Sequence, residues 1–538
     1  HLVLGDFNFP NINWELRMCL GSKEKIENRF LKFIDDRFWI QHISEPTRTR
    51  EGQTPHILDL ILTSKENIAN IEYFSPLGGS DHSVIGFSVD LEMLTCGVRR
   101  RLCYDLGDFQ GLNESLAGVM SAREKGNFSL ESEWTFFRNT LNDLTAMFVP
   151  TKGAGKKRNF RMSSELLKLI RLKHHLWKRI YKYGEIEKLL LFRKIRDKVK
   201  NDTKQLNIES QDRIAESYSD NPKYFWNYVR KKTRTRDKVG VLDTDSGDLH
   251  ENIDKANAFA KYFSSVYVTD GDFCGEGFCC PGVPVGGMQE LKIDACVVYK
   301  KLKELNKSKS AGPDGIHPRV LWETRESIFE YLSYMFEKSI ESGEVVNDWR
   351  TGDVVPIYKK GSKSTVENYR PITLTSVCCK ILESIVKDHI MSYFLQNNLF
   401  TRCQYGFLPA RSTTLQLLKF LDKLTEAIDL NKVVDVLYTD LEKAFDKISH
   451  SRLLYKLEQY GVHKKLLSWI ENYLKGRTFK VKINDDTSML LPVSSGVPQG
   501  SVLGPLLFIV YINDIQMACE DFFLFADDAK FYRVIEGT

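Results

Sequence analysis

The sequence lacks a hydrophobic run long enough to cross a membrane. Its longest apolar stretch, 502–512, is interrupted by Gly504 and Pro505 and is shorter than the roughly 20 residues that a bilayer requires. The first residues do not follow the charged and apolar pattern of a secretory leader either. We therefore expect an intracellular protein that is not secreted and has no membrane partner.

Regularly spaced cysteines and internal repeats are also missing. Eleven cysteines are scattered over 538 residues, which excludes a small disulfide-framed protein and indicates a reducing compartment. Cys274, Cys279 and Cys280 cluster, but no second Cys or His pair with zinc-site spacing lies near them, so no zinc site is predicted. The lack of a fixed period excludes solenoids and propellers.

The length and the uneven charge indicate several domains. Although the net charge is only +5, basic residues gather in the middle of the chain. Residues 1–90 alternate short apolar strands with polar turns, as in a layered α/β or sandwich domain, and 151–236 combine apolar residues at helical spacing with many Lys and Arg. The segment 271–287, rich in Gly, Pro and Cys, is predicted to be a connector, and mixed α and β structure follows it.

The basic middle segment predicts either a nucleic-acid surface or an ordinary solvated helix face. Between Lys152 and Lys204 cations outnumber acids and alternate with Trp177, Tyr181 and Tyr183. Such a surface suits phosphate backbones, with an affinity that falls as salt rises.

Three acids near the end of the chain predict a site for divalent cations. The apolar run 433–438 leads to Asp440, which we place at the end of a buried strand, before a helix over 441–449. Residues 522–532 predict two strands joined at a tip that carries Asp527 and Asp528. A solvated turn is the alternative, but two magnesium ions bridged by carboxylates are what nucleotidyl transfer requires.

Other segments supply groups for a nucleotide. The loop 494–501 offers Gln499, whose amide can contact a base or sugar, and Gly500, which permits close backbone approach. Lys359 and Arg370 flank a polar hairpin and offer cations for a triphosphate. The alternatives are a loop that leads into a core helix and unpaired surface charges.

The beginning of the chain carries a second set of polar residues. Asp6 and Asn8 are two residues apart at a strand end, so both can face one side. Asp59 lies in another strand, and Asp81 precedes His82. The Asp-His pair predicts a general-base unit in which the acid orients the imidazole, while Asp6 and Asn8 position water and phosphate; a structural role for the pair is the alternative.

In their order, six motifs resemble those of non-LTR reverse transcriptases, with the jockey and chicken-repeat elements most similar. The resemblance covers roughly 290–538. The motifs are Ser-Ala-Gly-Pro-Asp-Gly-Ile at 310–316, Asn-Tyr-Arg-Pro-Ile at 368–372, Gln-Tyr-Gly-Phe at 404–407, Asp-Leu-Glu-Lys-Ala-Phe-Asp at 440–446, Gly-Val-Pro-Gln-Gly at 496–500 and Phe-Ala-Asp-Asp at 525–528.

The resemblance implies a role for each matching residue. Asp440 and Asp527 are expected to coordinate two Mg²⁺ ions, for which Mn²⁺ could substitute, and Asp528 to assist at the second ion. Phe445 is expected to exclude a ribose 2′-hydroxyl, although a core aromatic is the alternative. The expected nucleotide contacts are Lys359 and Arg370 at the triphosphate, with Lys360 as a possible substitute, and Gln499 and Gly500 at the nucleotide and template pocket. Asp446 is predicted to be structural, because it follows in the expected helix and points elsewhere.

The N-terminal motifs resemble the C-terminal half of the apurinic/apyrimidinic endonuclease-like domain that precedes reverse transcriptase in the same elements. By that likeness Asp6, Asn8, Asp59, Asp81 and His82 are its active-site members. The family's upstream half, with a metal-binding glutamate and a tyrosine, is expected to lie before residue 1. We therefore expect no independent nicking by this chain.

Together these features predict a multidomain α+β protein. We expect part of an endonuclease-like α/β sandwich over 1–92, a basic helical linker over 93–290, and a reverse transcriptase over 291–538 with fingers and palm but no thumb. The expected function is RNA-directed DNA polymerisation in target-primed reverse transcription, with RNA template, DNA target or primer and deoxynucleoside triphosphates as partners, in a ribonucleoprotein of cytoplasm and nucleus. A non-catalytic nucleic-acid-binding remnant is the alternative. A nucleotide cyclase-like palm is a weaker one, since it leaves Gln499 and Arg370 unexplained.

Overall fold

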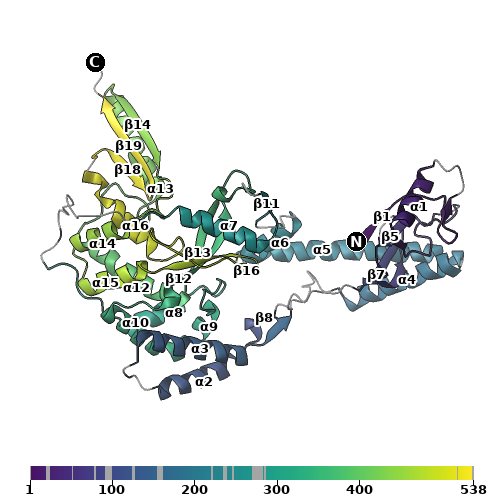
Figure 1. The fold of residues 1–538 in the computed structure, drawn as a ribbon, viewed down its shortest axis with the longest axis horizontal. Helices are drawn as coiled ribbons and strands as arrows, with labels where there is room; N and C mark the ends of the chain where they lie inside the picture. The colour runs from purple at the N-terminus through teal and green to yellow at the C-terminus, as the bar shows by residue number, and fades with distance from the viewer. Residues whose placement is uncertain are drawn as a thin grey trace. The chain divides into compact units, whose positions relative to one another are not determined.

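The structure, a computed structural model, is a mixed α and β protein, in agreement with the predicted fold class (Figure 1). It describes residues 2–19, 25–50, 53–77, 80–90, 100–123, 126, 128–153, 162–183, 185–219, 222–233, 239–244, 247–269, 283, 286–517 and 519–535. The chain contacts define two compact units. Unit 1 comprises 1–100 and 153–235, and unit 2 comprises 101–152 and 236–538. The segment 93–290 is therefore shared between both units, and Cys274, Cys279 and Cys280 lie outside the described residues.

Unit 1 contains a small antiparallel sheet. Its strands are β1 (Leu2–Asp6), β5 (Asp59–Thr63) and β4 (Ile40–Gln41), in the order β1-β5-β4. Helix α1 (Ile26–Asp36) contributes Ile34 to the core that Leu60 and Leu62 form on one face of β5. A hairpin of β6 (Ile68–Phe74) and β7 (Val84–Val89) and a short one of β2 (Ile12–Asn13) and β3 (Met18–Cys19) complete the strands.

The predicted basic helices are present in unit 1 as α4 (Ser164–Tyr183), α5 (Leu189–Glu216) and α6 (Pro222–Lys232). Leu176, Trp177 and Ile180 of α4 pack against Phe192 of α5. Trp177 therefore belongs to the core of this helix pair and is not available at the surface, whereas the Tyr183 side chain is 63% exposed. The helical apolar spacing that predicted the helices also explains the burial of Trp177.

The helices of unit 2 share one large hydrophobic core, in which Trp134, Trp349, Trp469 and Phe394 are fully buried. Single residues set the ends of several of these helices. Gly343 ends α10 because it adopts the left-handed conformation, and the Ser376 hydroxyl caps the N-terminus of α12. Within the described ranges, no helix is both long and apolar enough to cross a membrane. The core helices are α2 (Phe109–Ala122), α3 (Leu130–Phe148), α8 (Ala295–Lys303), α9 (Pro318–Glu323), α10 (Arg325–Ser342), α11 (Asn347–Arg350), α12 (Val377–Gln396), α14 (His450–Gln459), α15 (Lys464–Leu474) and α16 (Gly504–Ile512).

A first sheet of unit 2 has the strand order β13-β12-β15-β16. Strands β12 (Thr351–Tyr358) and β13 (Tyr369–Leu374) form the predicted hairpin, and β12 pairs in parallel with β15 (Thr478–Ile483). Strand β15 also pairs with the short strands β16 (Asp486–Thr487) and β17 (Leu491–Pro492). Helix α7 (Asn252–Ser265) packs on this sheet through Phe259 and Phe263 (Figure 1).

A second sheet has the order β14-β19-β18 and carries the three acids. Its strands are β14 (Val433–Asp440), β18 (Phe522–Phe525) and β19 (Asp528–Ile535). The strand before Asp440 is present, but the prediction that it is buried was wrong, because Val433 and Leu437 are 59% and 61% exposed. Strand β14 lies at the sheet edge, and α13 (Thr413–Asp429) packs on the other face, where Phe420 contacts Phe523.

The helix predicted after Asp440 is also absent. Residues 442–446 form turns, and the next helix, α14, begins at His450. Lys443 adopts a left-handed conformation with φ 54°, which interrupts a right-handed helix. The turns fold this motif back toward the cavity described below.

A buried carboxylate connects α12 to the start of α16. Glu383, which is fully buried, accepts hydrogen bonds at Oε2 from the backbone N–H of Val502, at 2.6 Å, and of Leu503, at 3.1 Å. These N–H groups precede the first turn of α16, where no helical carbonyl can accept from them. Glu383 thereby anchors α16, which directly follows the loop 494–501.

Replacing Glu383 tests this anchor. Glu383→Ala leaves two buried N–H groups without an acceptor and is expected to lower the free energy of unfolding by roughly 3 kcal/mol. Glu383→Gln keeps an acceptor oxygen and is the matched control, with less than half of that loss. Urea denaturation followed by circular dichroism measures both, and equal losses for the two variants would contradict the anchor.

Candidate active site

Three carboxylates meet where the second sheet of unit 2 borders a cavity of about 620 Å³. Asp440 of β14 stands directly opposite Asp528 of β19, while Asp527 occupies the turn between β18 and β19. Side chains directly opposite on antiparallel strands have Cβ atoms about 5 Å apart. The structure therefore brings together the acids that the sequence separates by almost ninety residues.

The hairpin tip that carries Asp527 is held in place by the segment 403–406. The buried Gln404 side chain accepts at Oε1 from the backbone N–H of Gly406, at 2.8 Å, and of Ala526, at 3.0 Å. The Tyr405 N–H donates to the Leu524 carbonyl at 2.8 Å, which adds this segment to the edge of β18. Ala526 has a left-handed φ of 58°. The Gln-Tyr-Gly-Phe motif thus fixes the position of the acidic turn.

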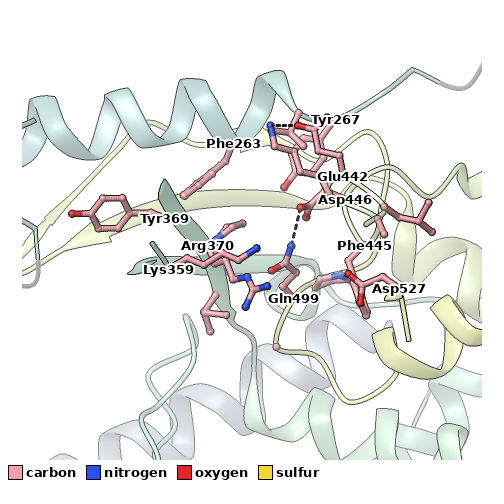
Figure 2. A pocket seen from close by; sticks show the side chains of 18 of the residues that line it. Phe263, Tyr267, Lys359, Tyr369, Arg370, Glu442, Phe445, Asp446, Gln499 and Asp527 are labelled. Atoms are coloured by element: carbon pink, nitrogen blue, oxygen red, sulfur yellow. Dashed lines mark hydrogen bonds and ion pairs between the residues drawn. The ribbon is translucent and has the colours of Figure 1, made fainter. Parts of the chain in front are cut away.

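The other predicted residues of this site also line the cavity. Lys359 follows β12, and Arg370 lies in β13 (Figure 2). The loop with Gln499 and Gly500 attaches to the same strand, since the Thr373 N–H donates to the Gln499 carbonyl at 2.8 Å. A Cβ at Gly500, where φ is 122°, would lie 2.5 Å from the Thr373 carbonyl oxygen, so only glycine fits this contact.

Phe445 lies between the apolar core and the cavity. Its ring stacks on Phe508 of α16 with centroids 4.5 Å apart and meets Phe407 edge-on at 6.2 Å. Its carbonyl accepts a hydrogen bond from the Val497 N–H at 2.8 Å. Phe445 is thus part of the core and of the cavity wall, and these contacts hold its ring in one place.

Asp446 also lines the cavity, which corrects the prediction that it points elsewhere. Its carboxylate accepts a 2.8 Å hydrogen bond from the Gln499 side-chain amide (Figure 2). Burial raises the pKa of Asp446 to about 6, although the hydrogen bond from Gln499 and the nearby Lys443 act in the opposite direction. The positive φ of Lys443, which sequence patterns did not reveal, directs Asp446 into the cavity.

The sequence prediction missed the aromatic wall of the cavity. Tyr262 and Phe263 of α7 and Tyr267, which follows it, line the same space and come from the segment predicted to be a basic linker. Figure 2 shows Phe263 and Tyr267 at the cavity. Burial, followed by the charge of Asp446, raises the pKa of Tyr267. Ala256, Phe259, Ala260 and Phe263 recur at helical spacing, a signal that could have shown α7 to be a core-facing helix.

The acids of this site suit a hard divalent cation. Ionised carboxylates only accept hydrogen bonds, and oxygen donors are what Mg²⁺ prefers. Asp440, Asp527 and Asp528 form no ion pair with another described residue. Among the described residues, the only three-donor group whose ligand atoms all lie within 4.8 Å is Asp6, Asp59 and His82 of unit 1. The wider spacing of the unit 2 acids is compatible with two ions about 4 Å apart.

The predicted residues at the N-terminus also converge. Asp6 and Asp59 are directly opposite on β1 and β5, and His82 Nδ1 lies 2.8 Å from Asp59 Oδ2. The Asn8 backbone N–H, in a residue with φ 51°, donates to Asp6 Oδ1 at 3.0 Å. The acid that orients the imidazole is thus Asp59, whereas the sequence had paired His82 with its neighbour Asp81.

Asp81 has a different partner. Its carboxylate accepts a 2.9 Å hydrogen bond from Arg48 Nε, with Arg50 at 3.3 Å, and lies 4.0 Å from His82 Nε2. The hydrogen bond from Arg48 lowers the pKa of Asp81. Arg48 was missed because no motif of the sequence links it to the Asp-His pair.

Comparisons with known proteins agree with both groups of residues. Residues 357–533 match the family model described as reverse transcriptase (RNA-dependent DNA polymerase). The chain carries a reverse transcriptase domain. Residues 1–86 match the model described as endonuclease-reverse transcriptase. The predicted resemblance is therefore confirmed for both regions.

The relatives of the reverse transcriptase domain come from mobile elements. The RNA-directed DNA polymerase from mobile element jockey of Drosophila melanogaster is 23% identical over 374 residues, which cover 66% of this chain and 40% of that protein. The probable RNA-directed DNA polymerase from transposon BS of the same species is 23% identical over 470 residues, or 84% of this chain and 51% of the relative. That from transposon X-element is 28% identical over 224 residues, 41% of this chain and 25% of the relative. The chain thus spans about half or less of the length of these relatives.

Gly406 tests the packing of the acidic turn. A Cβ at this position would lie 2.3 Å from the Ala526 backbone nitrogen, so Gly406→Ala must displace the turn or the 403–406 segment. We expect a loss of about 1–3 kcal/mol in the free energy of unfolding, from overpacking. Thermal unfolding measures this loss. In the matched control Gly118→Ala, on the exposed face of α2, nothing lies within 4 Å of the added Cβ, and stability should be kept or rise. Equal stability of the two variants would show that the contact is unimportant.

Proposed function

We propose that the reverse transcriptase domain is an RNA-directed DNA polymerase that adds deoxynucleotides to a primer 3′-hydroxyl in target-primed reverse transcription. One observation carries the proposal: Asp440, Asp527 and Asp528 converge at one cavity whose lining also includes the cations Lys359 and Arg370. Carboxylates beside cations suit a reaction in which metal ions and a triphosphate meet. The relatives named RNA-directed DNA polymerases support an RNA template and a DNA primer.

In this proposal the residues that line the cavity hold the metal ions and the nucleotide in place. Asp440 and Asp527 would hold two Mg²⁺ or Mn²⁺ ions, with Asp528 assisting, and such ions would supply activation of the primer hydroxyl and stabilisation of the departing pyrophosphate. Lys359 and Arg370 bind the triphosphate through charge-assisted hydrogen bonds, and Lys360 is a possible substitute for Lys359. Gln499 and Gly500 shape the nucleotide pocket. The anchored Phe445 ring occupies the space of a ribose 2′-hydroxyl, which favours deoxynucleotides. The first sheet of unit 2 corresponds to fingers and the second to the palm.

In unit 1 we propose an endonuclease-like site formed by Asp6, Asn8, Asp59, Asp81 and His82. Asp59 orients His82 and holds its Nδ1 proton, which leaves Nε2 available as a base. The convergence of Asp6, Asp59 and His82 also offers three ligands for a divalent cation. The proposed target is the phosphodiester backbone of DNA.

The exposed basic helices favour a second candidate function, which is nucleic-acid binding without catalysis. Helices α4 and α5 of unit 1 carry many Lys and Arg residues on their exposed faces. Two results together would favour this function. The chain would bind RNA in a salt-dependent way that Asp440→Ala does not abolish, and it would extend no primer under any condition. For either function we propose an intracellular ribonucleoprotein of cytoplasm and nucleus.

Substitution of the acids tests the polymerase. On an RNA template with a DNA primer and Mg²⁺, Asp440→Ala and Asp527→Ala are each expected to lower the extension rate by about a thousandfold or more, which corresponds to roughly 4 kcal/mol of lost transition-state stabilisation. Asp435→Ala is the matched control, because Asp435 is an exposed acid of the same strand β14 and does not line the cavity. Undiminished extension by Asp527→Ala would refute the role of that acid.

Phe445 tests selectivity for the sugar. Phe445→Ala removes the ring beside the cavity and is expected to raise incorporation of ribonucleotides relative to deoxynucleotides by tenfold or more, with a smaller effect on deoxynucleotide incorporation. Competing single-nucleotide insertions with dTTP and UTP measure this ratio. Phe508→Leu removes the ring that stacks on Phe445 but does not line the cavity, so it should raise the ratio less than Phe445→Ala does. An unchanged ratio in Phe445→Ala would make Phe445 a core aromatic only.

A further inference from the structure

Asp446 is fixed beside the nucleotide cavity although the proposed reaction gives it no task. Its backbone carbonyl accepts a 2.7 Å hydrogen bond from the Ser495 hydroxyl, and its backbone N–H donates to the Lys443 carbonyl at 2.9 Å. A Cβ at Gly496 would lie 2.6 Å from the same Asp446 carbonyl oxygen, so the two loops are in close contact. These contacts hold the backbone of Asp446, and the hydrogen bond from Gln499 holds its carboxylate.

The hydrogen bond between the two side chains has a fixed direction. An ionised carboxylate accepts hydrogen bonds and cannot donate them, whereas a glutamine amide has a donor end and an acceptor end. Gln499 Nε2 therefore donates to Asp446 Oδ2 at 2.8 Å, as Figure 2 shows. The backbone of Gln499 is held independently, by the hydrogen bond from Thr373. With both ends constrained, the amide has one favoured orientation, in which Oε1 is the end turned away from Asp446.

We propose that Asp446 is a positioning residue that fixes the orientation of the Gln499 amide, so that Oε1 is presented as an acceptor to the incoming nucleotide. This proposal rests on the proposed polymerase function. Asp446 then determines which end of the Gln499 amide faces the substrate. It therefore affects nucleotide binding more than the chemical step.

The surroundings of Asp446 make the orientation of the Gln499 amide depend on pH. Lys443 on its own turn favours the carboxylate, while Tyr267, Arg477 and Gln499 line a cavity of about 20 Å³ beside it. Burial raises the pKa of Asp446 to about 6. Once protonated, the carboxyl group can donate to Oε1 as well as accept from Nε2, so either amide orientation becomes possible. Nucleotide affinity should therefore fall as the pH drops through about 6.

Asp446→Asn tests the proposal with the full chain. An asparagine has nearly the same shape, but it can pair with either end of Gln499 at every pH. For primer extension with dTTP at pH 8 we expect the KM to rise about three- to tenfold, the effect of one misdirected hydrogen bond, with kcat within about twofold. The parent KM should rise below pH 6, whereas the KM of Asp446→Asn should not change there. Asp435→Asn, on the exposed face of β14, is the control and should behave like the parent.

A second substitution shows whether Asp446 acts through Gln499. Gln499→Met has a similar length and no amide, so adding Asp446→Asn to it should change the KM no further. Gln499→Met alone should also lose the KM increase below pH 6, which provides the test if Asp446→Asn does not fold. Persistence of that increase in Gln499→Met, or full additivity of the two substitutions, would overturn the proposal.

Calorimetric titration of dTTP with Mg²⁺ separates this proposal from the proposed function. If the parent extends primers and Asp446→Asn has the same KM and pH profile as the parent, the positioning role is overturned while the proposed polymerase function stands. A parent that neither extends primers nor binds dTTP overturns both. The positioning role is supported, without relying on turnover, if Asp446→Asn binds dTTP more weakly than the parent at pH 8 and equally well at pH 5.

Discussion

The crowding of like charges at the hairpin tip is the constraint on which the site of unit 2 depends. Three carboxylates that converge on one cavity repel one another, and the backbone must hold them together. The register of β14 and β19 fixes Asp440 opposite Asp528, and Gln404 fixes the turn with Asp527. A divalent cation reduces the repulsion, so the geometry that is unfavourable for the empty site is favourable for a loaded one.

Close backbone contacts at three glycines also hold the loops around the cavity. Gly500 rests on the Thr373 carbonyl, Gly496 on the Asp446 carbonyl and Gly406 on the Ala526 nitrogen, at distances that leave no room for a side chain. These three glycines belong to motifs that line or adjoin the cavity. Their contacts explain how short loops from distant parts of the sequence acquire fixed positions without large buried areas of their own.

The two units carry different groups of polar residues. Unit 1 combines basic helices with a cluster of Asp6, Asp59 and His82, which suits a phosphodiester, whereas unit 2 combines acids and cations around a cavity that suits a nucleoside triphosphate. Histidine oriented by a carboxylate serves proton transfer, and paired carboxylates serve metal binding.

The sequence by itself determined the mixed α and β class, the basic helices of unit 1, the strands β14, β18 and β19 of unit 2, and the two groups of polar residues. Short-range periodicity and motif order reveal these features because they do not depend on tertiary contacts. It did not determine that β14 is half exposed, that 441–449 forms turns, that Trp177 is buried, that Asp59 is the partner of His82, or that Asp446 and α7 face the cavity. Each of these depends on which element packs against a given face, or on a single left-handed residue such as Lys443. Tertiary packing decides these features, because the intrinsic helix and strand preferences of single residues are weak compared with packing.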